Sequence, residues 1–141
     1  MNIPELLSDL SINYSAIIRK AAGKLNLTSS QAFQLLSVPY DGIAMSQLSN
    51  KLGLDTSTLT RNINNLIKIN LVIKRQDSED KRIYKIFLTQ SGLNTVAKIE
   101  NSLLETHNQV FKTLDLDYQE NLIEILEKLV WSFDCLKENN R

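Results

Sequence analysis

The sequence predicts a mainly α-helical chain with one small β-hairpin, and three observations support this class. Most apolar residues recur at steps of three and four, as they do on the buried face of an amphipathic helix. Residues 71–88 instead hold two β-rich segments separated by a polar loop. The chain has 141 residues, of which 43% are hydrophobic, so it can bury one core of ordinary domain size.

Two helices are predicted in the first third of the chain. The first, residues 6–25, carries a single apolar stripe. The stripe consists of Leu6, Leu7, Leu10, Tyr14, Ile17, Ile18, Ala21 and Leu25. The second is expected to begin after Thr28, because Thr28 and Gln31 have the spacing of a capping box, and to end at Pro39.

Two shorter helices joined by a tight turn are predicted next. Ser46 is expected to cap the first of them, and Gly53 to follow it in the left-handed conformation. The segment 55–58 supplies the N-cap of the second, whose apolar positions share one face. Asn70 is expected to end it as a left-handed residue. The opposite face has no acidic residue after the cap and reads Ser57, Thr58, Thr60, Arg61, Asn64, Asn65 and Lys68.

A hairpin and two long helices complete the prediction. Residues 71–75 and 83–88 are expected to form the strands, and residues 76–82 the polar loop between them. Two helices joined by a tight turn and followed by a hairpin are the signature of a winged helix-turn-helix domain. A long helix is then expected from Thr89, a turn at 115–118, and a final helix with an apolar stripe.

The charges are distributed unevenly along the chain. The 16 basic and 16 acidic residues cancel overall, but residues 45–86 hold eight basic and four acidic side chains, a net charge of +4. The segment before them is neutral, and the segment after them carries −4. A basic middle segment favours contact with an anionic partner, and nucleic acid is the first candidate.

Several function classes are disfavoured by the sequence. No apolar run is long enough to span a bilayer and no signal peptide is recognisable, so no membrane association and a cytoplasmic location are expected. The chain has one cysteine, Cys135, and one histidine, His107. One residue of each kind gives no internal disulfide, no metal cluster and no identifiable catalytic pair, and no cofactor is expected. Glu120, Glu124 and Glu127 have helical spacing, but a solvated helix face explains them better than metal binding. An intersubunit disulfide through Cys135 is conceivable, although an inert thiol is favoured.

The candidate DNA-binding residues lie on the acid-free helix face and on the hairpin. Arg61 and Asn64 are long enough to reach base edges, while Ser57, Thr58 and Thr60 lie near the helix N-terminus, which favours phosphate. On the hairpin, Arg82 could enter a minor groove if Asp77 or Asp80 orients it. An ordinary solvated surface is the simpler alternative for both. The hairpin contributes Lys74, Arg75, Asp80, Lys81 and Arg82.

With these motifs the chain resembles the MarR family of regulators. The resemblance rests on residues 48–61, 71–75, 77–82 and 88–92. The family's wing pattern, D-x-R-D-x-R, is matched at Asp77, Asp80 and Arg82, whereas Glu79 stands where the pattern has Arg. Asn70 also replaces the glycine that is usual after this helix.

The resemblance implies a homodimer that binds a pseudo-palindromic double-stranded DNA operator. Residues 28–90 would form the winged helix-turn-helix region, and residues 1–27 and 91–141 the helical dimerisation region. Family members usually act as repressors that release DNA on binding small aromatic acids or phenols. The implied effector crevice lies between the two regions, where Tyr14, Arg19, Phe33 and Tyr40 are candidate contacts, although core packing explains them equally well.

Two functions other than a DNA-binding regulator are alternatives for this sequence. A winged-helix domain can also serve as a protein-interaction module without touching DNA. The basic middle segment and the acid-free helix face favour DNA over that alternative. An enzyme is the least supported reading, because neither His107 nor Cys135 has an identifiable acid or base partner.

Overall fold

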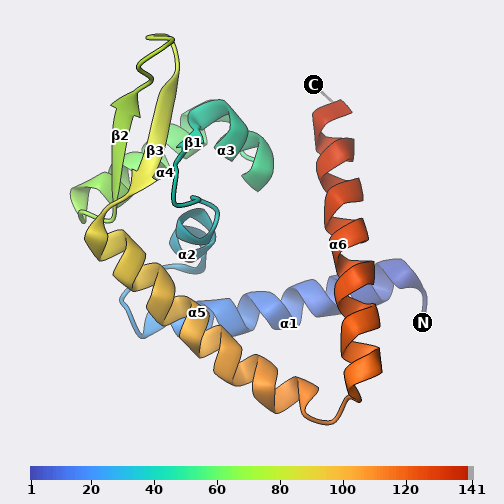
Figure 1. Cartoon of the computed structure of the whole chain (residues 1–141). Coiled ribbons are helices and arrows are strands. Elements are labelled where there is room, and N and C mark those ends of the chain that lie inside the picture. The colour runs from blue at the N-terminus through green and yellow to red at the C-terminus, as the bar shows by residue number, and fades with distance from the viewer. Residues whose placement is uncertain (140–141) are drawn as a thin grey trace.

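The computed structural model describes residues 1–139, and these form six helices and three short strands (Figure 1). The predicted class, mainly α-helical with a small β-hairpin, is confirmed. The elements in chain order are α1 (Ile3–Gly23), α2 (Ser29–Leu36), β1 (Ile43–Ala44), α3 (Met45–Leu52), α4 (Thr56–Lys68), β2 (Val72–Gln76), β3 (Tyr84–Leu88), α5 (Gln90–Phe111) and α6 (Leu116–Asn139). The final helix therefore begins inside the segment that was expected to be a turn.

The sheet has one strand more than the sequence predicted. Its order is β1-β3-β2, with both pairs antiparallel. Ile86 at the centre of β3 lies opposite Lys74 of β2 and Ile43 of β1. A strand of two residues is too short to show an alternating pattern, and β1 exists only because the free edge of β3 offers it hydrogen-bond partners.

The first core lies under the winged helix-turn-helix elements. Leu48 of α3, Leu59 of α4 and Ile86 of β3 are each 0% exposed. The buried residues of this core are Leu35, Val38, Leu48, Leu59, Ile63, Leu66, Leu71, Val72 and Ile86. This core holds α3, α4 and the sheet together as one unit.

A second core joins α1, α2 and α5. Its buried residues are Ile18, Ala21, Ala22, Ala32, Ile99 and Leu103. Helix α2 contributes to both cores, because Leu35 faces the first and Ala32 faces the second. The predicted regions 28–90 and the flanking helices are thus connected through α2, and their assignment to DNA binding and dimerisation stays a prediction.

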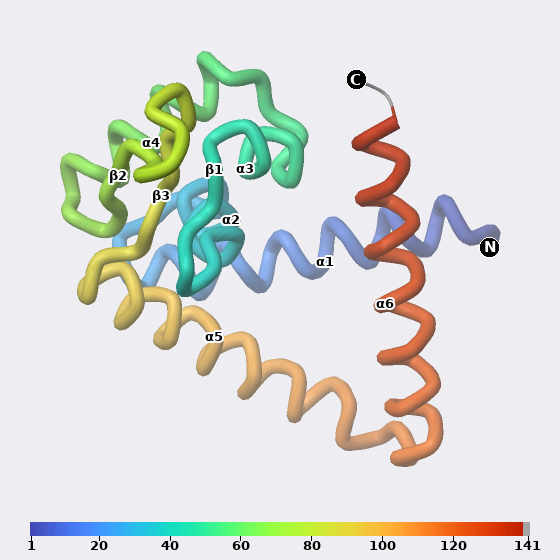
Figure 2. The backbone as a smooth tube through the Cα atoms, turned by 45° about the horizontal axis from the view of Figure 1, so that its top comes forward, coloured from blue at the N-terminus to red at the C-terminus, as the bar shows by residue number. Residues whose placement is uncertain are grey.

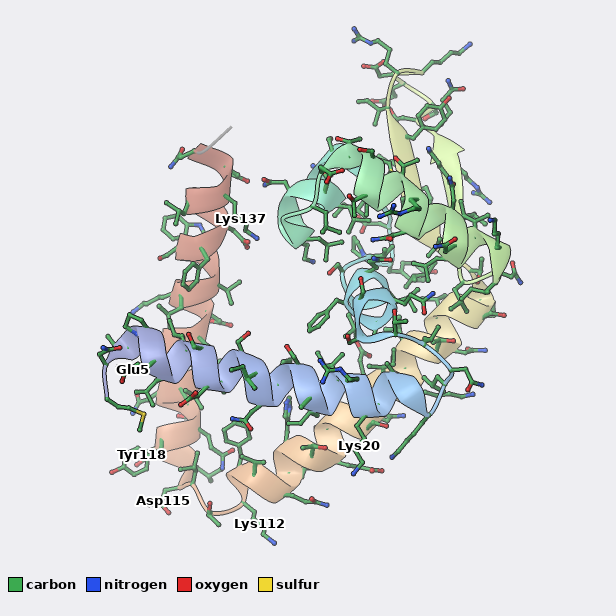
Figure 3. The ribbon with its side chains drawn as sticks, turned by 180° about the vertical axis from the view of Figure 1, so that it is seen from behind. Glu5, Lys20, Lys112, Asp115, Tyr118 and Lys137 are labelled. Carbon is green, nitrogen blue, oxygen red and sulfur yellow. The ribbon has the colours of Figure 1, made fainter. Side chains whose placement is uncertain are left out.

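Helix α6 stands apart from both cores, as the turned view in Figure 2 makes plain. It has no buried residue within its bounds, Leu116–Asn139. It contacts α3, where the Lys137 ammonium donates to the Lys51 carbonyl at 3.0 Å. Figure 3 shows Lys137 near one end of α6 and Tyr118 near the other. None of the helices in residues 1–139 is long and apolar enough to cross a membrane.

Helix ends follow the local sequence at most of the predicted places. Thr28 and Gln31 form the predicted capping box, and Asp55 and Thr89 cap α4 and α5. Gly53 and Asn70 have φ angles of 65° and 60°, as predicted for left-handed residues.

The predicted cap at Ser46 is wrong. Ala44 occupies the N-cap position of α3, and the Gln47 side chain accepts a hydrogen bond from the Ala44 backbone N–H. Pairing of β1 with β3 places the start of α3 two residues earlier than Ser46 would. A capping box at Asn2 and Glu5 was not predicted, and it begins α1 at Ile3.

Replacement of Gly92 by Ala tests the packing of α5 against the wing. A Cβ atom at Gly92 would collide with the backbone carbonyl of Leu71, which is itself fixed by the Thr89 N–H. We expect Gly92→Ala to destabilise the fold by at least about 1 to 3 kcal/mol in urea unfolding. Gly23→Ala is the matched control, because nothing lies within 4 Å of its added Cβ; equal losses in both variants would refute this packing argument.

Candidate nucleic-acid interface

The outer face of α4 forms a shallow surface groove. Its inner face is anchored by Leu59, Ile63 and Leu66, which are at most 1% exposed. The groove is lined by seven polar or basic residues, Thr56, Ser57, Thr60, Arg61, Asn64, Asn65 and Lys68. No acidic side chain lines it, so the face offers an anionic partner basic and polar groups without repulsion.

The Asp55 carboxylate organises the start of α4. It accepts hydrogen bonds from the Thr58 backbone N–H at 2.7 Å and from the Thr58 hydroxyl at 2.8 Å. The Ser57 hydroxyl donates to the same carboxylate at 3.0 Å. These bonds favour the charged form and lower the pKa of Asp55 to about 2. Asp55 is therefore ionised at neutral pH and accepts all three bonds.

The three hydroxyl groups that were expected to contact phosphate are already engaged within the chain. Besides Ser57 and Thr58, Thr60 donates its hydroxyl proton to the Thr56 carbonyl at 2.8 Å. The sequence-based expectation placed all three hydroxyls at phosphate. In the structure their single protons point to acceptors of α4 and its cap, so they have none left for a phosphate oxygen.

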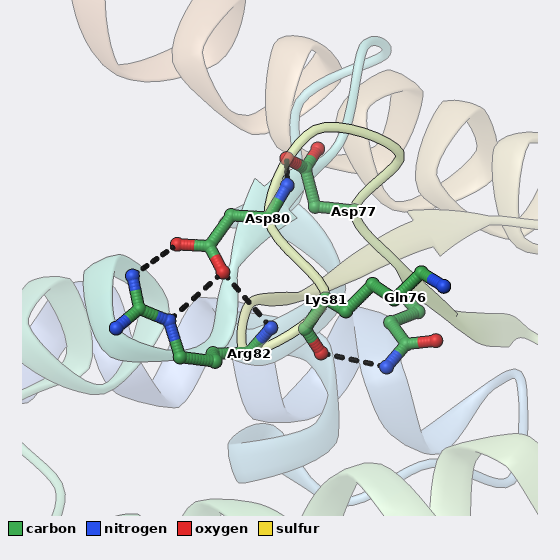
Figure 4. A network of polar contacts seen from close by, with 5 residues as sticks. All are labelled: Gln76, Asp77, Asp80, Lys81 and Arg82. Carbon is green, nitrogen blue, oxygen red and sulfur yellow. Dashed lines mark hydrogen bonds and ion pairs between the residues drawn. The ribbon is translucent and has the colours of Figure 1, made fainter.

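The tip of the wing, residues 77–82, is built around an ion pair between Asp80 and Arg82 (Figure 4). Two guanidinium nitrogens of Arg82 donate to the two carboxylate oxygens of Asp80, each at 3.0 Å. The Arg82 backbone N–H donates to the same carboxylate. Of the two carboxylates expected to orient Arg82, the structure thus selects Asp80.

Asp77 has a different role in the wing. Its carboxylate accepts the Asp80 backbone N–H at 3.1 Å and lies 3.7 Å from the Lys85 ammonium. The Gln76 side chain closes the loop by donating to the Lys81 carbonyl. These contacts position Asp80, which in turn positions Arg82.

The Asp80–Arg82 pair orients a charge that stays exposed. The paired guanidinium lowers the pKa of Asp80, and the carboxylate raises that of Arg82. The Arg82 side chain is 90% exposed, so water screens the pair and its value for stability is small. What the pair provides is a bidentate geometry that holds the guanidinium plane in one direction.

The remaining basic residues of the wing lie along or at the end of its strands. The Lys74 ammonium lies 4.9 Å from the ring centre of Tyr84, and the Arg75 guanidinium 5.9 Å from that of Phe87. Both residues are exposed on β2, as is Lys81 in the loop. The predicted basic residues of the hairpin thus lie on a single two-stranded unit next to α4.

The four candidate effector contacts lie in different surroundings. Tyr14 stacks on His107 with ring centres 6.0 Å apart, and Phe33 packs against the core shared by α1, α2 and α5. Arg19 is exposed, and Tyr40 is 85% exposed in the turn after α2. The hollows along α4, between α3 and α6, and on α6 are lined by other residues. The effector crevice stays a prediction.

Sequence reasoning missed one residue of the α4 groove. Thr56 lines the groove together with Thr60, Asn64 and Lys68. Steps of four residues place these four side chains on one helix face, and this spacing could have identified Thr56. Its position in the N-cap segment 55–58 masks this spacing in the sequence.

Residues 1–139 contain no group of three or more His, Cys, Asp or Glu side chains that could hold a metal ion. Glu124 instead pairs with Lys128 at 2.6 Å, in a surface i,i+4 contact. Cys135 is a half-buried free thiol on α6.

Comparison with known proteins matches both the fold and the sequence. The sequence model of the MarR family matches residues 39–84, which run from the turn before β1 into β3. SarZ, an HTH-type transcriptional regulator from Staphylococcus epidermidis, is 29% identical over 125 residues, covering 84% of this chain and 82% of SarZ. The chain thus resembles the MarR family in the sequence of this segment and in its fold.

Another relative and two solved structures are also similar to this chain. SarZ from Staphylococcus haemolyticus is 32% identical over 90 residues, which are 62% of this chain and 58% of that protein. The structure of a MarR protein from Peptoclostridium difficile is 26% identical, with a TM-score of 0.84 over 100% of this chain and 93% of the other. MepR of S. aureus, solved in complex with DNA, shares the fold with a TM-score of 0.74 at 20% identity over 94% of this chain and 98% of MepR. Both SarZ proteins are named as HTH-type transcriptional regulators.

The N-cap of α4 makes the stability of the fold depend on pH in the acidic range. The folded-state pKa of Asp55 is about 2, below its ordinary value of 3.8. The contribution of this carboxylate to the free energy of unfolding is therefore complete above pH 4 and is lost as the pH falls toward 2. We expect Asp55→Ala to lower the melting temperature by a few degrees at pH 7, and Asp55→Asn by less, because an amide oxygen still accepts. Thermal melts at pH 7 and pH 2.5 should show the gap between wild type and Asp55→Ala narrowing. A gap independent of pH would contradict the role of the carboxylate.

Proposed function

We propose that this protein is a sequence-specific double-stranded DNA-binding transcriptional repressor of the MarR family. The observation that carries the proposal is the acid-free groove on α4 next to a wing whose Arg82 is held by Asp80. MarR-family regulators bind DNA, and MepR, which has this fold, was solved bound to DNA. In this arrangement α4 would lie in the major groove and Arg82 would reach an adjacent minor groove.

We further propose that the protein acts as a homodimer. The apolar stripe of α6 has nothing to cover it within residues 1–139, and α1 exposes Ile3, Leu6, Leu10 and Ile12. Exposed apolar surface of this extent marks an interface. The large apolar side chains exposed on α6 are Leu116, Tyr118, Ile123, Ile125, Leu126, Val130, Trp131, Phe133 and Leu136. A two-fold dimer matches a pseudo-palindromic operator with half-sites about 10 to 10.5 bp apart.

Release by a small aromatic acid or phenol is the finer part of the proposal. It is supported by the stacked Tyr14 and His107, which join α1 to α5 beside Phe111. A ligand there would act only by favouring a separation of the two winged domains that does not fit the operator. The alternative, a protein-interaction module, accounts less well for a groove without acidic side chains.

Paired substitutions on α4 and the wing separate recognition of bases from contact with phosphates. We expect Arg61→Ala to weaken operator binding by about 1 to 3 kcal/mol and to relax base preference at one position per half-site. Lys81→Ala should weaken binding to all sequences alike and lower the salt slope by about 1 per site, because it neutralises one phosphate. Fluorescence anisotropy on operator and random duplexes at several salt concentrations separates the two. If both variants lose affinity equally on both duplexes, α4 does not recognise the base sequence.

Substitution of Asp80 tests the orientation of Arg82. Removing a negative charge beside DNA should strengthen binding if Asp80 is a bystander. We expect the opposite, weaker binding by Asp80→Ala, because Arg82 would lose the carboxylate that holds its guanidinium. Arg82→Ala should cost more affinity than Lys81→Ala, and Asp80→Ala should have little further effect in the Arg82→Ala background. Tighter binding by Asp80→Ala in the same anisotropy assay would refute the orienting role.

A panel of small aromatic carboxylates tests effector release. At millimolar concentration an effective acid should lower operator affinity about 5- to 150-fold, the usual range of allosteric coupling. It should also raise the melting temperature of the free protein, because it binds the folded state. Aliphatic acids of equal charge are the control. If no acid changes either quantity, effector release is abandoned while DNA binding stands.

A further inference from the structure

Two hydroxyl groups in the α4 groove have a fixed hydrogen-bond polarity. Ser57 and Thr60 both line the groove, and each donates its proton inside the chain. The acceptor for Ser57 is the Asp55 carboxylate at 3.0 Å, and the acceptor for Thr60 is the Thr56 carbonyl at 2.8 Å. Neither a carbonyl nor an ionised carboxylate can donate a proton, so the hydroxyls must be the donors in both bonds.

The remaining capacity of these hydroxyls is to accept. A hydroxyl has one proton and two lone pairs, so Ser57 and Thr60 present only lone pairs to a partner in the groove. Turning the Ser57 proton outward would break a charge-assisted bond, which is stronger than a bond between neutral groups. Turning the Thr60 proton outward would give up its bond to a carbonyl within the helix.

Few groups of a DNA duplex can donate to these lone pairs. Phosphate oxygens, guanine O6 and N7, and thymine O4 are acceptors. In the major groove the donors are the exocyclic amino groups, N6 of adenine and N4 of cytosine. Beyond Thr60 the groove carries Arg61, Asn64, Asn65 and Lys68, all of which can donate to guanine, thymine or phosphate. Within the groove, Ser57 and Thr60 therefore present acceptors, whereas the side chains from Arg61 onward present donors.

We propose that Ser57 and Thr60 are specificity-determining residues that accept hydrogen bonds from the exocyclic amino group of adenine or cytosine. They are then not phosphate ligands. The inference rests on the proposed binding of DNA through α4 and names the base edge that this part of the groove reads. Because every base pair carries one such amino group, it predicts that affinity depends on that amino group, and not on O6, N7 or O4, at the positions read by Ser57 and Thr60.

Two other threonines provide matched controls. Thr58 donates to Asp55 as Ser57 does, but it is half-buried and does not line the groove. Thr56 lines the groove, and its hydroxyl makes no hydrogen bond within residues 1–139, so it remains free to donate to phosphate. Thr58→Val therefore reports the structural cost of losing a bond to Asp55, and Thr56→Val reports the loss of a hydroxyl that can donate.

The first experiment selects preferred half-sites from randomised duplexes with the full-length protein and its variants. Ser57→Ala and Thr60→Val should each lower affinity for the selected site about 3- to 10-fold, the value of one hydrogen bond. They should leave affinity for random DNA and the salt slope unchanged. Thr58→Val should keep the wild-type base preference, and Thr56→Val should weaken selected and random sites alike.

The second experiment removes the amino group from the DNA. Adenine is replaced by unsubstituted purine, and cytosine by 2-pyrimidinone, at each position where the preference depends on Ser57 or Thr60. Wild type should lose about 3- to 10-fold in affinity on the modified duplex. The corresponding variant should lose less than about 2-fold on the same change, because the hydrogen bond is already absent.

Distinct results overturn this inference and the function on which it rests. Wild type that selects no sequence overturns both. Wild type that keeps its full affinity when the amino group is removed at the positions sensitive to Ser57 and Thr60 overturns the inference while sequence-specific binding stands. Equal losses by Ser57→Ala and Thr60→Val on selected and random DNA, or no loss at all, also overturn it.

Discussion

Burial of the inner face of α4 is the constraint on which the candidate interface depends. Leu59, Ile63 and Leu66 pack into the core formed with α3 and the sheet, and each is at most 1% exposed. Full burial of such a side chain contributes about 1.5 to 3 kcal/mol, so α4 cannot rotate without losing several of these contributions. Because a helix has two faces, fixing the inner one also fixes the direction of Ser57, Thr60 and Arg61 on the outer one.

The wing is positioned by the same core from its other side. Ile86 of β3 is buried and central in the sheet, and Val72 anchors the beginning of β2. From this base the hairpin extends into solvent, where packing no longer determines side-chain directions. Hydrogen bonds take over that role at the tip, through Asp77 to Asp80 and from Asp80 to Arg82.

Helix α2 connects the interface to the long helices. Leu35 packs beneath α4 and the sheet, while Ala32 packs against α1 and α5. The eight residues of α2 therefore contact both the winged unit and the long helices. A second connection runs outside the cores, from Lys137 of α6 to the Lys51 carbonyl in the last turn of α3. Both connections link helices with exposed apolar surface to the unit that carries the α4 groove.

The sequence by itself determined the elements whose signals are local. Capping residues at Thr28, Asp55 and Thr89 and the left-handed residues Gly53 and Asn70 act within one turn of chain, so their outcome was predictable. The tertiary structure decided what depends on distant partners. Strand β1 and the start of α3 follow from pairing with β3, and Asp80 rather than Asp77 orients Arg82 because Asp77 is engaged with Lys85 and the loop backbone. Hydroxyl directions on α4 were likewise not predictable, because side-chain spacing places a hydroxyl on a face but only the acceptor geometry around it decides where its proton points.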